Sequence, residues 1–306
     1  MGSIIRKQTE ILVIGGGAAG MAAASAAALN GARVMLCDER PYLGGILPQC
    51  IHSGFGIGRY GREMTGPEYC ALEEAAFRES GAEFLPETSV LSIEPDRGAV
   101  VSGPQGLMRI GFEECVLAAG CRERPLWSLP VEGTRPSGIY TAGEAQEMIN
   151  LGHMDIGSRV FILGSGDIGM IMARRFTLLG KTVLGIAEIK DHLGGLKRNQ
   201  LDCIEAYGIP VYLASTVTAV HGYPHLEAVT LLDTDSGSSH IIECDTLITS
   251  LGLIPDQSLA EALMTEEGLP GWLHLCGNAD TVHEIADSVS AEGDRLGKEL
   301  GGRMQP

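Results

Sequence analysis

The sequence predicts an α/β protein built from two nested, doubly wound domains, the first of which is discontinuous. Its 306 residues suffice for two medium-sized domains, each with its own core. A β-rich run, a glycine-rich turn, a helix of small residues and a second apolar strand follow one another in residues 11–39, and the same order recurs in residues 158–188. The first glycines of the two turns, Gly15 and Gly164, stand a whole domain apart, so this duplication is not a solenoid repeat.

The first copy starts in an uncharged stretch, residues 11–29, that is long enough to span a membrane. Three adjacent glycines near its start argue against one continuous helix, so a buried strand, a turn and an alanine-rich helix are expected instead. A glycine-rich loop over residues 43–62 and a helix over about 66–80 follow. Residues 100–120 then predict a hairpin with its turn at residues 103–106 and a strand that ends at Ala119.

The rest of the chain fixes the expected domain boundaries. Residues 135–145 are expected to cross into the second copy, and residues 253–257 to return from it. The chain closes with a strand within residues 272–278 and a helix from about 285 to 300. The expected domains are therefore residues 1–140 together with 255–306, interrupted by residues 141–254.

The composition excludes several classes of partner and site. The net charge is -17 and no cluster of Lys and Arg occurs, so nucleic acid and anionic membranes are not expected partners. The eight cysteines form no CxxC pair and no Cys/His spacing typical of a metal site, so no metal is expected. Scattered cysteines without a secretory signal indicate reduced thiols, a cytoplasmic location and no integral membrane segment.

The first glycine turn, residues 15–20, reads GGGAAG and fits the G-x-G-x-x-G pattern. Such glycines permit a tight turn and let the backbone approach a pyrophosphate, which the helix N-terminus then binds. Asp38, with Glu39 beside it, follows at the end of the next strand, where a carboxylate accepts hydrogen bonds from an adenosine ribose. The sequence therefore predicts a dinucleotide site here, against the alternative of a glycine turn without ligand.

The second glycine turn, residues 164–169, reads GSGDIG. Counting from its first glycine places Ala187 at the position that matches Asp38, with Glu188 next, and an acid there favours NAD(H) over NADP(H). Asp167 is unusual, because a carboxylate beside a diphosphate is repelled unless it points away; it can instead cap the helix. A turn that has lost its ligand remains the alternative. The basic residues that keep NADP(H) as the less favoured cofactor are Lys190, Lys197 and Arg198.

Four motifs resemble, in order, those of the two-dinucleotide-binding-domain flavoproteins, the pyridine nucleotide-disulphide oxidoreductase superfamily. They are VIGGGAAG (13–20), LAAGCRERP (117–125), LITSLGLIPD (247–256) and LHLCGNAD (273–280). The resemblance covers nearly the whole chain and implies two nested Rossmann-like domains in a thioredoxin-reductase-like organisation. It also implies that the first domain binds FAD and the second NAD(H).

Further stretches resemble a narrower group, the small flavoproteins associated with anaerobic glycerol-3-phosphate utilisation and the flavin subunits of amine, opine, proline and cyanide-forming glycine dehydrogenases. The stretches are GGILPQCIHSGFG, GCRERP, GSGDIGMIMARR, GGLKRN and CGNADTVHEIADSVSAEG. This resemblance implies either a homo-oligomer or a partner, namely a second flavin or iron–sulfur subunit. Two positions depart from the superfamily: Asn278 replaces the Asp that holds the ribityl chain, and Ile171 replaces a Glu near the nicotinamide.

The motifs and the resemblance together give the expected binding residues. For FAD they are Gly15, Gly17, Ala18, Ala19, Gly20, Asp38, Glu39, Arg40, Gly45, Ile46, Cys50, Val90, Ala119, Gly120, Arg122, Gly277 and Asn278. For NAD they are Gly164, Gly166, Asp167, Ile168, Gly169, Glu188 and Gly252.

The loop LGGILPQCIHSGFG, residues 43–56, holds the candidate catalytic residues Cys50 and His52. Disulphide reductases of the superfamily use two redox cysteines, whereas only Cys50 follows the glycine pair here, so a dithiol relay is not expected. Cys50 is then a lone reactive thiol or a half-buried neighbour of the flavin. His52 is a proton-transfer candidate or bonds a backbone carbonyl, and His283 either assists at the flavin or caps a helix.

These features predict an FAD-dependent oxidoreductase that exchanges hydride with NAD(H) and passes electrons to a partner subunit or a small acceptor. Two alternatives stay open. One is a flavin subunit of an amine or hydroxy-acid dehydrogenase whose second nucleotide site is unused. The other is a non-catalytic electron-transfer or assembly subunit.

Overall fold

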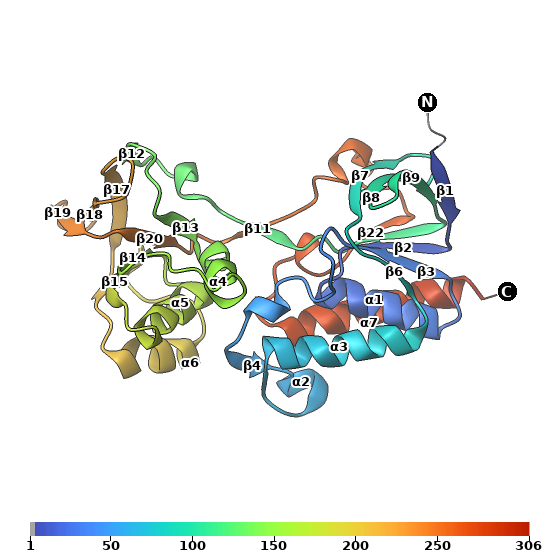
Figure 1. The fold of residues 1–306 in the computed structure, drawn as a ribbon, viewed down its shortest axis with the longest axis horizontal. Helices are drawn as coiled ribbons and strands as arrows, with labels where there is room; N and C mark the ends of the chain where they lie inside the picture. Colours follow the sequence, from blue (N-terminus) through green and yellow to red (C-terminus); the bar gives the residue numbers. More distant parts are fainter. Residues whose placement is uncertain (1–3, 306) are drawn as a thin grey trace. The chain divides into compact units, whose positions relative to one another are not determined.

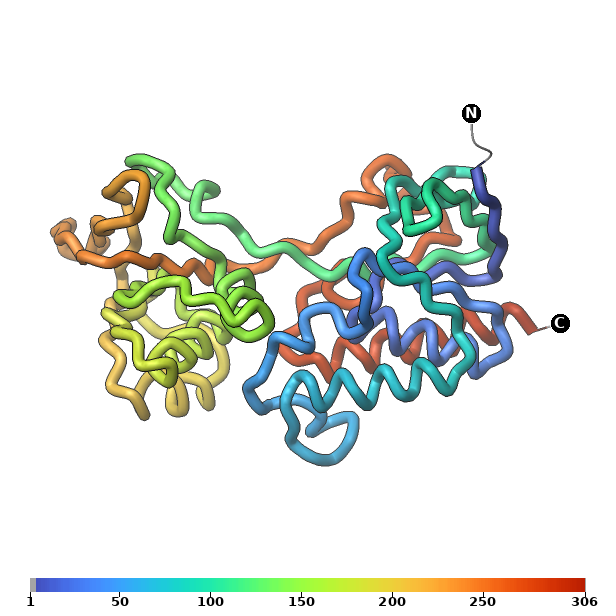
Figure 2. The backbone as a smooth tube through the Cα atoms, viewed as in Figure 1, coloured from blue at the N-terminus to red at the C-terminus, as the bar shows by residue number. Residues whose placement is uncertain are grey.

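The computed structural model describes residues 4–305, which form two compact units (Figures 1 and 2). The first unit comprises Met1–Arg122 and Ile254–Pro306, and the second comprises Glu123–Leu253. The expected boundary at residue 140 therefore moves to residue 122. The reason is strand pairing. β12 (Glu132–Gly133) pairs with β17 (Ser215–His221), and β13 (Ile139–Thr141) pairs with β20 (Thr246–Thr249), both in the second unit.

The first unit is centred on a parallel sheet of five strands in the order β22-β10-β2-β3-β6. The strands are β2 (Ile11–Ile14), β3 (Val34–Cys37), β6 (Glu83–Leu85), β10 (Glu114–Leu117) and β22 (Leu273–Leu275). Residues 11–29 form β2, a turn and α1 (Ala18–Leu29), as the sequence predicts. No helix of the described residues is long and apolar enough to cross a membrane.

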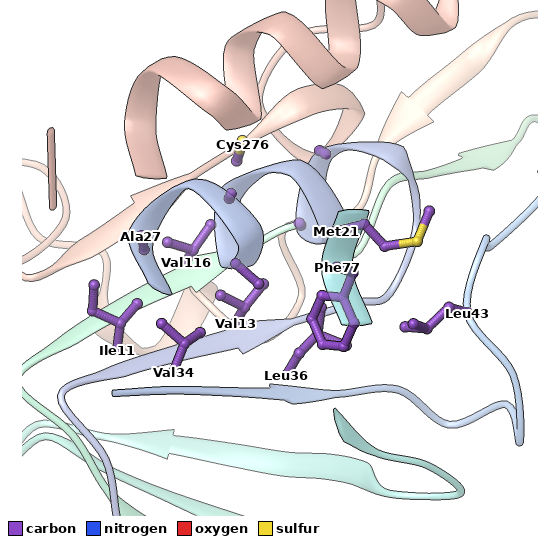
Figure 3. Close-up of a cluster of buried hydrophobic side chains, with 14 of the residues drawn as sticks. Ile11, Val13, Met21, Ala27, Val34, Leu36, Leu43, Phe77, Val116 and Cys276 are labelled. Carbon is purple, nitrogen blue, oxygen red and sulfur yellow. The ribbon is translucent and has the colours of Figure 1, made fainter. Parts of the chain in front are cut away.

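Three helices cover one face of this sheet (Figure 1), and α1 contacts both of the other two. The other two are α3 (Gly66–Ser80) and α7 (Ala286–Arg303), close to their expected bounds. Strand side chains alternate between the faces, so Val13 and Leu36 point toward Met21 of α1 and Phe77 of α3 in the aliphatic core drawn in Figure 3. The other face is buried by the cluster that contains Leu12 and Ile110.

That second face is covered by a four-stranded sheet in the order β1-β9-β8-β7. Its strands are β1 (Ile5–Gln8), β7 (Ser89–Glu94), β8 (Gly98–Gly103) and β9 (Gly106–Gly111). The hairpin of β8 and β9 turns at residues 103–106, which confirms the expected hairpin. The glycine-rich segment between β3 and α3 holds four short elements, which are a 3-10 helix (Leu47–Gln49), β4 (Ser53–Phe55), α2 (Ile57–Tyr60) and β5 (Met64–Thr65).

Helices α1 and α7 approach each other at backbone distance because three glycines of α7 face α1. A Cβ atom added at Gly293, Gly297 or Gly301 would lie 2.3, 2.2 or 2.7 Å from the carbonyl oxygens of Ala19, Ala23 and Ala27 respectively. The glycines recur every four residues, which places them on one side of α7. This packing sets the position of the start of α1, where the first glycine turn ends.

The second unit repeats the parallel sheet, in the order β13-β20-β14-β15-β16. Its further strands are β14 (Arg159–Leu163), β15 (Thr182–Ala187), β16 (Val211–Tyr212) and β20 (Thr246–Thr249). Its helices are α4 (Ala142–Asn150), α5 (Asp167–Leu178) and the short α6 (Lys197–Asn199). A second sheet, β12-β17-β18-β19, adds β17 (Ser215–His221), β18 (Ala228–Asp233) and β19 (Ser239–Glu243). The two crossing segments, β11 (Cys121–Glu123) and β21 (Leu253–Pro255), pair with each other.

Candidate functional site

The first glycine turn joins β2 to α1 and is sterically restricted to glycine at two positions. Gly15 has φ +103°, and a Cβ there would lie 2.4 Å from the carbonyl oxygen of Ala118. A Cβ at Gly20 would lie 1.8 Å from the carbonyl oxygen of Gly15. A Cβ at Gly17, in contrast, would meet nothing within 4 Å. The turn is therefore tight against its own strand and open beside Gly17, as a ligand approaching the backbone requires.

The start of α1 suits an anion. Gly17 is its N-cap, no side chain caps it, and its first turn contains no acidic residue. The backbone N–H groups of a helix start have no intrahelical partner and carry the positive end of the helix dipole. A diphosphate group beside Gly17 would satisfy these N–H groups, so the turn fits a dinucleotide.

Asp38 is held at the rim of this turn by two backbone groups. Its Oδ2 atom accepts a hydrogen bond of 2.6 Å from the N–H of Gly16, and its Oδ1 atom accepts one of 2.8 Å from the N–H of Arg40. Its carboxylate is thereby fixed next to the turn while the residue stays partly exposed. A carboxylate in this position can accept hydrogen bonds from ribose hydroxyl groups.

The other residues expected to bind FAD follow strands of the same parallel sheet, and their strand ends share one edge. Ala119 and Gly120 follow β10, and Gly277 and Asn278 follow β22. Val90 lies on β7 instead, where it packs against the cluster that contains Ile14 and Cys37. Arg122 lies on β11 and faces Asp256, with 3.4 Å between Nε and Oδ2. Ligands of open α/β sheets bind at this carboxyl edge.

The loop that follows Asp38 returns over the first glycine turn. The N–H of Gly44 donates a hydrogen bond of 2.8 Å to the carbonyl oxygen of Gly16. A Cβ at Gly45 would lie 3.1 Å from the Cα atom of Gly17. Ile46, next in the loop, is exposed. This close approach explains the glycine pair and keeps residues 44–46 beside the open side of the turn.

The two catalytic candidates of this loop differ in their surroundings. The Cys50 side chain is buried, its Sγ lies 3.3 Å from the carbonyl oxygen of Ile46, and burial raises its pKa to about 12. A thiol that stays protonated at neutral pH is a poor nucleophile. The Nδ1 atom of His52 lies 3.0 Å from the carbonyl oxygen of Ser53, and its ring packs on Phe55. Both environments favour the structural interpretation of these residues.

A polar cluster surrounds Asn278. One of its members, Glu292, was not predicted from the sequence. The Oδ1 atom of Asn278 accepts a hydrogen bond of 2.9 Å from the N–H of His283, and its Nδ2 atom lies 3.7 Å from the Sγ atom of Cys121. The Nε2 atom of His283 lies 2.6 Å from Oε2 of Glu292 on α7. The Oε1 atom of Glu292 accepts a hydrogen bond of 2.9 Å from the N–H of Gly277. His283 therefore pairs with a carboxylate and does not cap a helix through its side chain.

The second glycine turn joins β14 to α5 and repeats the geometry of the first. Gly164 has φ +98°, and a Cβ there would lie 2.2 Å from the carbonyl oxygen of Ser250, which corresponds to Ala118. A Cβ at Gly169 would lie 2.6 Å from the carbonyl oxygen of Gly164. Gly166 is the N-cap of α5, Ile168 packs against the core of this unit, and Gly252 follows β20.

The carboxylate that corresponds to Asp38 is Glu188, so the alignment with Ala187 is wrong. Its Oε2 atom accepts hydrogen bonds from Ser165, at 3.0 Å from the N atom and 2.6 Å from Oγ. Its Oε1 atom accepts one of 3.2 Å from the N–H of Lys190. The register of β14 and β15 shifts where Phe161 pairs with Gly185, and this bulge adds one residue that a count along the sequence cannot reveal.

Asp167 does not cap α5, which corrects a second expectation. It is the first residue of the helix, and no side chain caps the helix start. Its Oδ1 atom instead accepts hydrogen bonds of 2.7 Å from the N–H of Leu196 and 2.7 Å from Nδ2 of Asn199. The side chain thus turns toward the loop before α6 while its charge stays at the helix start.

That loop is itself part of the duplication. The sequence LGG occurs at residues 43–45 and again at 193–195, in each case five residues after the acid. In the second unit, the N–H of Gly194 donates a hydrogen bond of 2.7 Å to Oγ of Ser165, as Gly44 contacts Gly16 in the first. The repeated tripeptide was the signal that could have revealed the loop. Lys197 and Arg198 follow it and are exposed, and no group of three His, Cys, Asp or Glu within residues 4–305 is placed to hold a metal ion.

Comparisons with known proteins agree with this duplicated architecture. The family described as pyridine nucleotide-disulphide oxidoreductase matches residues 9–274. Among solved structures, thioredoxin reductase of T. acidophilum superposes with a TM-score of 0.77 at 19% identity and covers 97% of this chain and 99% of its own. L-proline dehydrogenase of P. horikoshii superposes with a TM-score of 0.69 at 20% identity, covering 98% of this chain and 56% of its own. At these identities the likeness shows the fold.

Several curated relatives are named as subunits. Hydrogen cyanide synthase subunit HcnB of Pseudomonas protegens is 27% identical over 298 residues, which cover 88% of this chain and 62% of the relative. An opine oxidase subunit of Rhizobium meliloti is 27% identical over 58% of this chain and 38% of its own. The alpha subunit of sarcosine oxidase from Corynebacterium sp. is 26% identical over 82% of this chain and 27% of its own. The chain therefore spans less than two thirds of the length of each.

Proposed function

We propose that this chain, which belongs to the pyridine nucleotide-disulphide oxidoreductase family, transfers hydride between NAD(H) and a bound FAD and passes electrons to a partner subunit or a small acceptor. Family membership implies binding of FAD and of a nicotinamide nucleotide. The division of the two cofactors between the two glycine turns, the choice of NAD and the direction of electron flow are part of the proposal.

The observation that carries the proposal is the equivalence of the two glycine turns. Each has a sterically required glycine against the neighbouring strand and a carboxylate that accepts a backbone N–H from the turn. In the first the carboxylate is Asp38, and in the second it is Glu188. Because the geometry is duplicated, two dinucleotides can be held in the same manner, one in each unit.

The assignment of FAD to the first turn is supported by what surrounds it. The residues proposed to hold FAD are Gly17, Asp38, Gly45, Gly120 and Asn278, all of which follow strands of one sheet or lie in the loop over the turn. When bound, FAD supplies the hydride-accepting chemistry that no side chain offers. The chain binds the diphosphate at the start of α1, orients the ribose through Asp38 and offers the side chain of Asn278 as a neutral hydrogen-bonding group.

The proposal assigns NAD(H) rather than NADP(H) to the second turn. The carboxylate of Glu188 is buried and fixed by Ser165 and Lys190, so it is placed to accept bonds from ribose hydroxyl groups. A 2′-phosphate at that position would face this fixed negative charge. Lys197 and Arg198 are exposed, and the Nζ atom of Lys197 lies 3.3 Å from Oε1 of Gln200 and 3.6 Å from Oε1 of Glu205.

One observation favours a second candidate function. Asp167 places a carboxylate at the start of α5, where Ala18 stands in the first unit. The relatives named above are subunits of a synthase and of two oxidases. Both facts suit a flavin subunit that receives electrons from an amine or hydroxy acid through a partner, with the second turn left without nucleotide.

Both candidate functions require bound FAD, so identifying the bound cofactor tests both of them. We expect the purified protein to release FAD on denaturation, at about one FAD per chain. Substituting Gly20 by Val should abolish this binding, because the side chain would displace the carbonyl oxygen of Gly15, while the equivalent Gly169→Val should leave FAD in place. Protein that never contains or takes up FAD would refute both candidates.

A further inference from the structure

The pair formed by His283 and Glu292 stands out among the polar groups of the first unit. Its atoms Nε2 and Oε2 lie 2.6 Å apart, a distance typical of a charge-assisted hydrogen bond. The side chains are 25% and 18% exposed, so the pair is mostly buried yet still in contact with water. A proton can therefore be held between the two groups and can also reach them from solvent.

The pair is built into the region proposed to hold FAD. Glu292 accepts the N–H of Gly277 through its second carboxylate oxygen, and the N–H of His283 binds the side chain of Asn278. Gly277 packs against the start of α1, since a Cβ there would lie 2.7 Å from the Cβ atom of Ala19. One hydrogen bond thus separates Glu292 from a residue packed on the start of α1, and one separates His283 from Asn278, a residue proposed to hold FAD.

Among the described residues near the pair, the other charged groups either have partners of their own or lie at the surface. Helix α1 carries no charged residue. Asp287 on α7 is buried, but its two oxygens accept the N–H groups of Gly56 and Arg59. The remaining charged groups on the same loop and helix are Asp280, Glu284, Asp294, Arg295, Lys298, Glu299 and Arg303, of which Asp294 binds Arg59 and the other six are exposed.

We propose that His283 and Glu292 form a proton-storing pair that is coupled to the redox state of the flavin. This inference rests on the proposed function. When two electrons and one proton reduce the flavin, a negative charge remains on its ring, and that charge favours a cation nearby. The pair then takes one proton from water onto the imidazole, and it returns this proton to water when the flavin is reoxidised. Glu292 acts as the positioning residue, because it orients the ring and balances the charge of the imidazolium.

The chain offers a matched control for this pair. The Nε2 atom of His274 on β22 lies 2.7 Å from Oε2 of Glu114, and the side chains are 19% and 15% exposed. This second pair has the same chemistry and similar burial, but Glu114 begins β10, at the sheet end opposite the glycine turn. If the loss of any His–Glu pair changed proton uptake, variants of either pair should show the change.

The test is the number of protons taken up per two electrons, read from the slope of the flavin midpoint potential against pH above neutrality. FAD-loaded wild-type protein and His274→Gln should take up about one proton more than His283→Gln and Glu292→Gln. Glu292→Gln keeps an acceptor for the N–H of Gly277, so it removes the charge without removing that contact.

Equal slopes in wild-type protein and His283→Gln would overturn the inference, and so would an equal loss in His274→Gln. These results leave the proposed function intact, because each requires a bound flavin that titrates. Protein that binds no FAD in any form would instead overturn the proposed function, and this inference with it.

Discussion

The carboxylate of Asp167 and the side-chain amide of Asn199 are joined by a hydrogen bond of 2.7 Å, which ties α6 to the first turn of α5. The same carboxylate oxygen accepts the N–H of Leu196. In the first unit the corresponding position is Ala18, whose side chain can form no such bond. The duplicated turns therefore share their geometry but differ in charge.

This difference predicts the effect of Asp167→Asn on nucleotide binding. An Asn oxygen can still accept the bonds from Leu196 and Asn199, while the charge that repels a diphosphate is gone. We expect NADH to bind about tenfold more tightly, which corresponds to about 1.4 kcal/mol. Titration of NADH fluorescence measures this, with Asp167→Ala as the variant that also loses the tether. Weaker binding by Asp167→Asn would show instead that the charge itself supports the ligand.

The glycine contacts between α1 and α7 predict a large loss of stability from one added methyl group. Gly297→Ala places a Cβ 2.2 Å from the carbonyl oxygen of Ala23, so the helices must separate. We expect the free energy of unfolding to fall by about 2–3 kcal/mol in urea denaturation.

Gly302 in the same helix provides the control for this experiment. A Cβ there meets nothing within 4 Å, so Gly302→Ala should leave stability unchanged or raise it by up to about 1 kcal/mol. Similar losses in both variants would mean that helix propensity, and not the close packing, governs the result.

The ion pair between Arg59 of α2 and Glu73 of α3 predicts a second effect on stability. The Nε atom of Arg59 lies 2.5 Å from Oε1 of Glu73, whose side chain is only 2% exposed, and Nη1 lies 2.6 Å from Asp294. Arg59→Met leaves a buried carboxylate without its cation, and we expect a loss of about 3 kcal/mol. The exposed pair of Arg78 and Glu74 is the comparison, and Arg78→Met should change stability by less than about 0.5 kcal/mol. A smaller loss at Arg59 than at Arg78 would contradict this account.

The burial of Cys50 predicts both its reactivity and a pH dependence. Its pKa rises from the ordinary 9.0 to about 12 because burial disfavours the thiolate. Between these values only the unfolded chain loses the proton, so the stability contributed by the thiol is complete below pH 9 and falls as the pH rises through this window.

The corresponding measurement is alkylation followed by mass spectrometry of the native protein at neutral pH. Cys121, partly exposed, should react before the other seven cysteines, all of which are buried. Cys50→Ser should leave reduction of the bound flavin unchanged. Rapid alkylation of Cys50, or a large loss of flavin reduction in Cys50→Ser, would restore the thiol as a catalytic candidate.

Most of the fold could be predicted from the sequence because its signals are local. The strand, glycine turn and helix at residues 11–29 follow from apolar pattern and glycine spacing alone, and the structure confirms them. The alignment of the acids failed because it depends on strand pairing. One bulged residue in β15 moves Glu188, rather than Ala187, to the turn, and no residue type in that stretch indicates it.

The polar cluster at Asn278 was hidden for a similar reason. Glu292 lies on the same helix as the glycines that pack on α1, and its sequence neighbourhood reads as an ordinary polar helix. Its carboxylate reaches Gly277 and His283 because the chain turns between β22 and α7, and the polar pattern of the sequence does not show that turn. The domain boundary was misplaced by the same kind of effect, since the pairing of β12 and β13 assigns residues 123–140 to the second unit.

The central claim is that NAD(H) and FAD exchange hydride in this chain, and anaerobic titration of the FAD-loaded protein with NADH tests it most directly. We expect the flavin absorbance at about 450 nm to bleach rapidly with about one NADH per FAD, and NADPH to act more weakly. The titration includes any partner subunit that co-purifies, and Gly169→Val should prevent bleaching while FAD stays bound. Bound FAD that resists NADH but is bleached by an amine or a hydroxy acid would contradict the claim and support the dehydrogenase subunit instead.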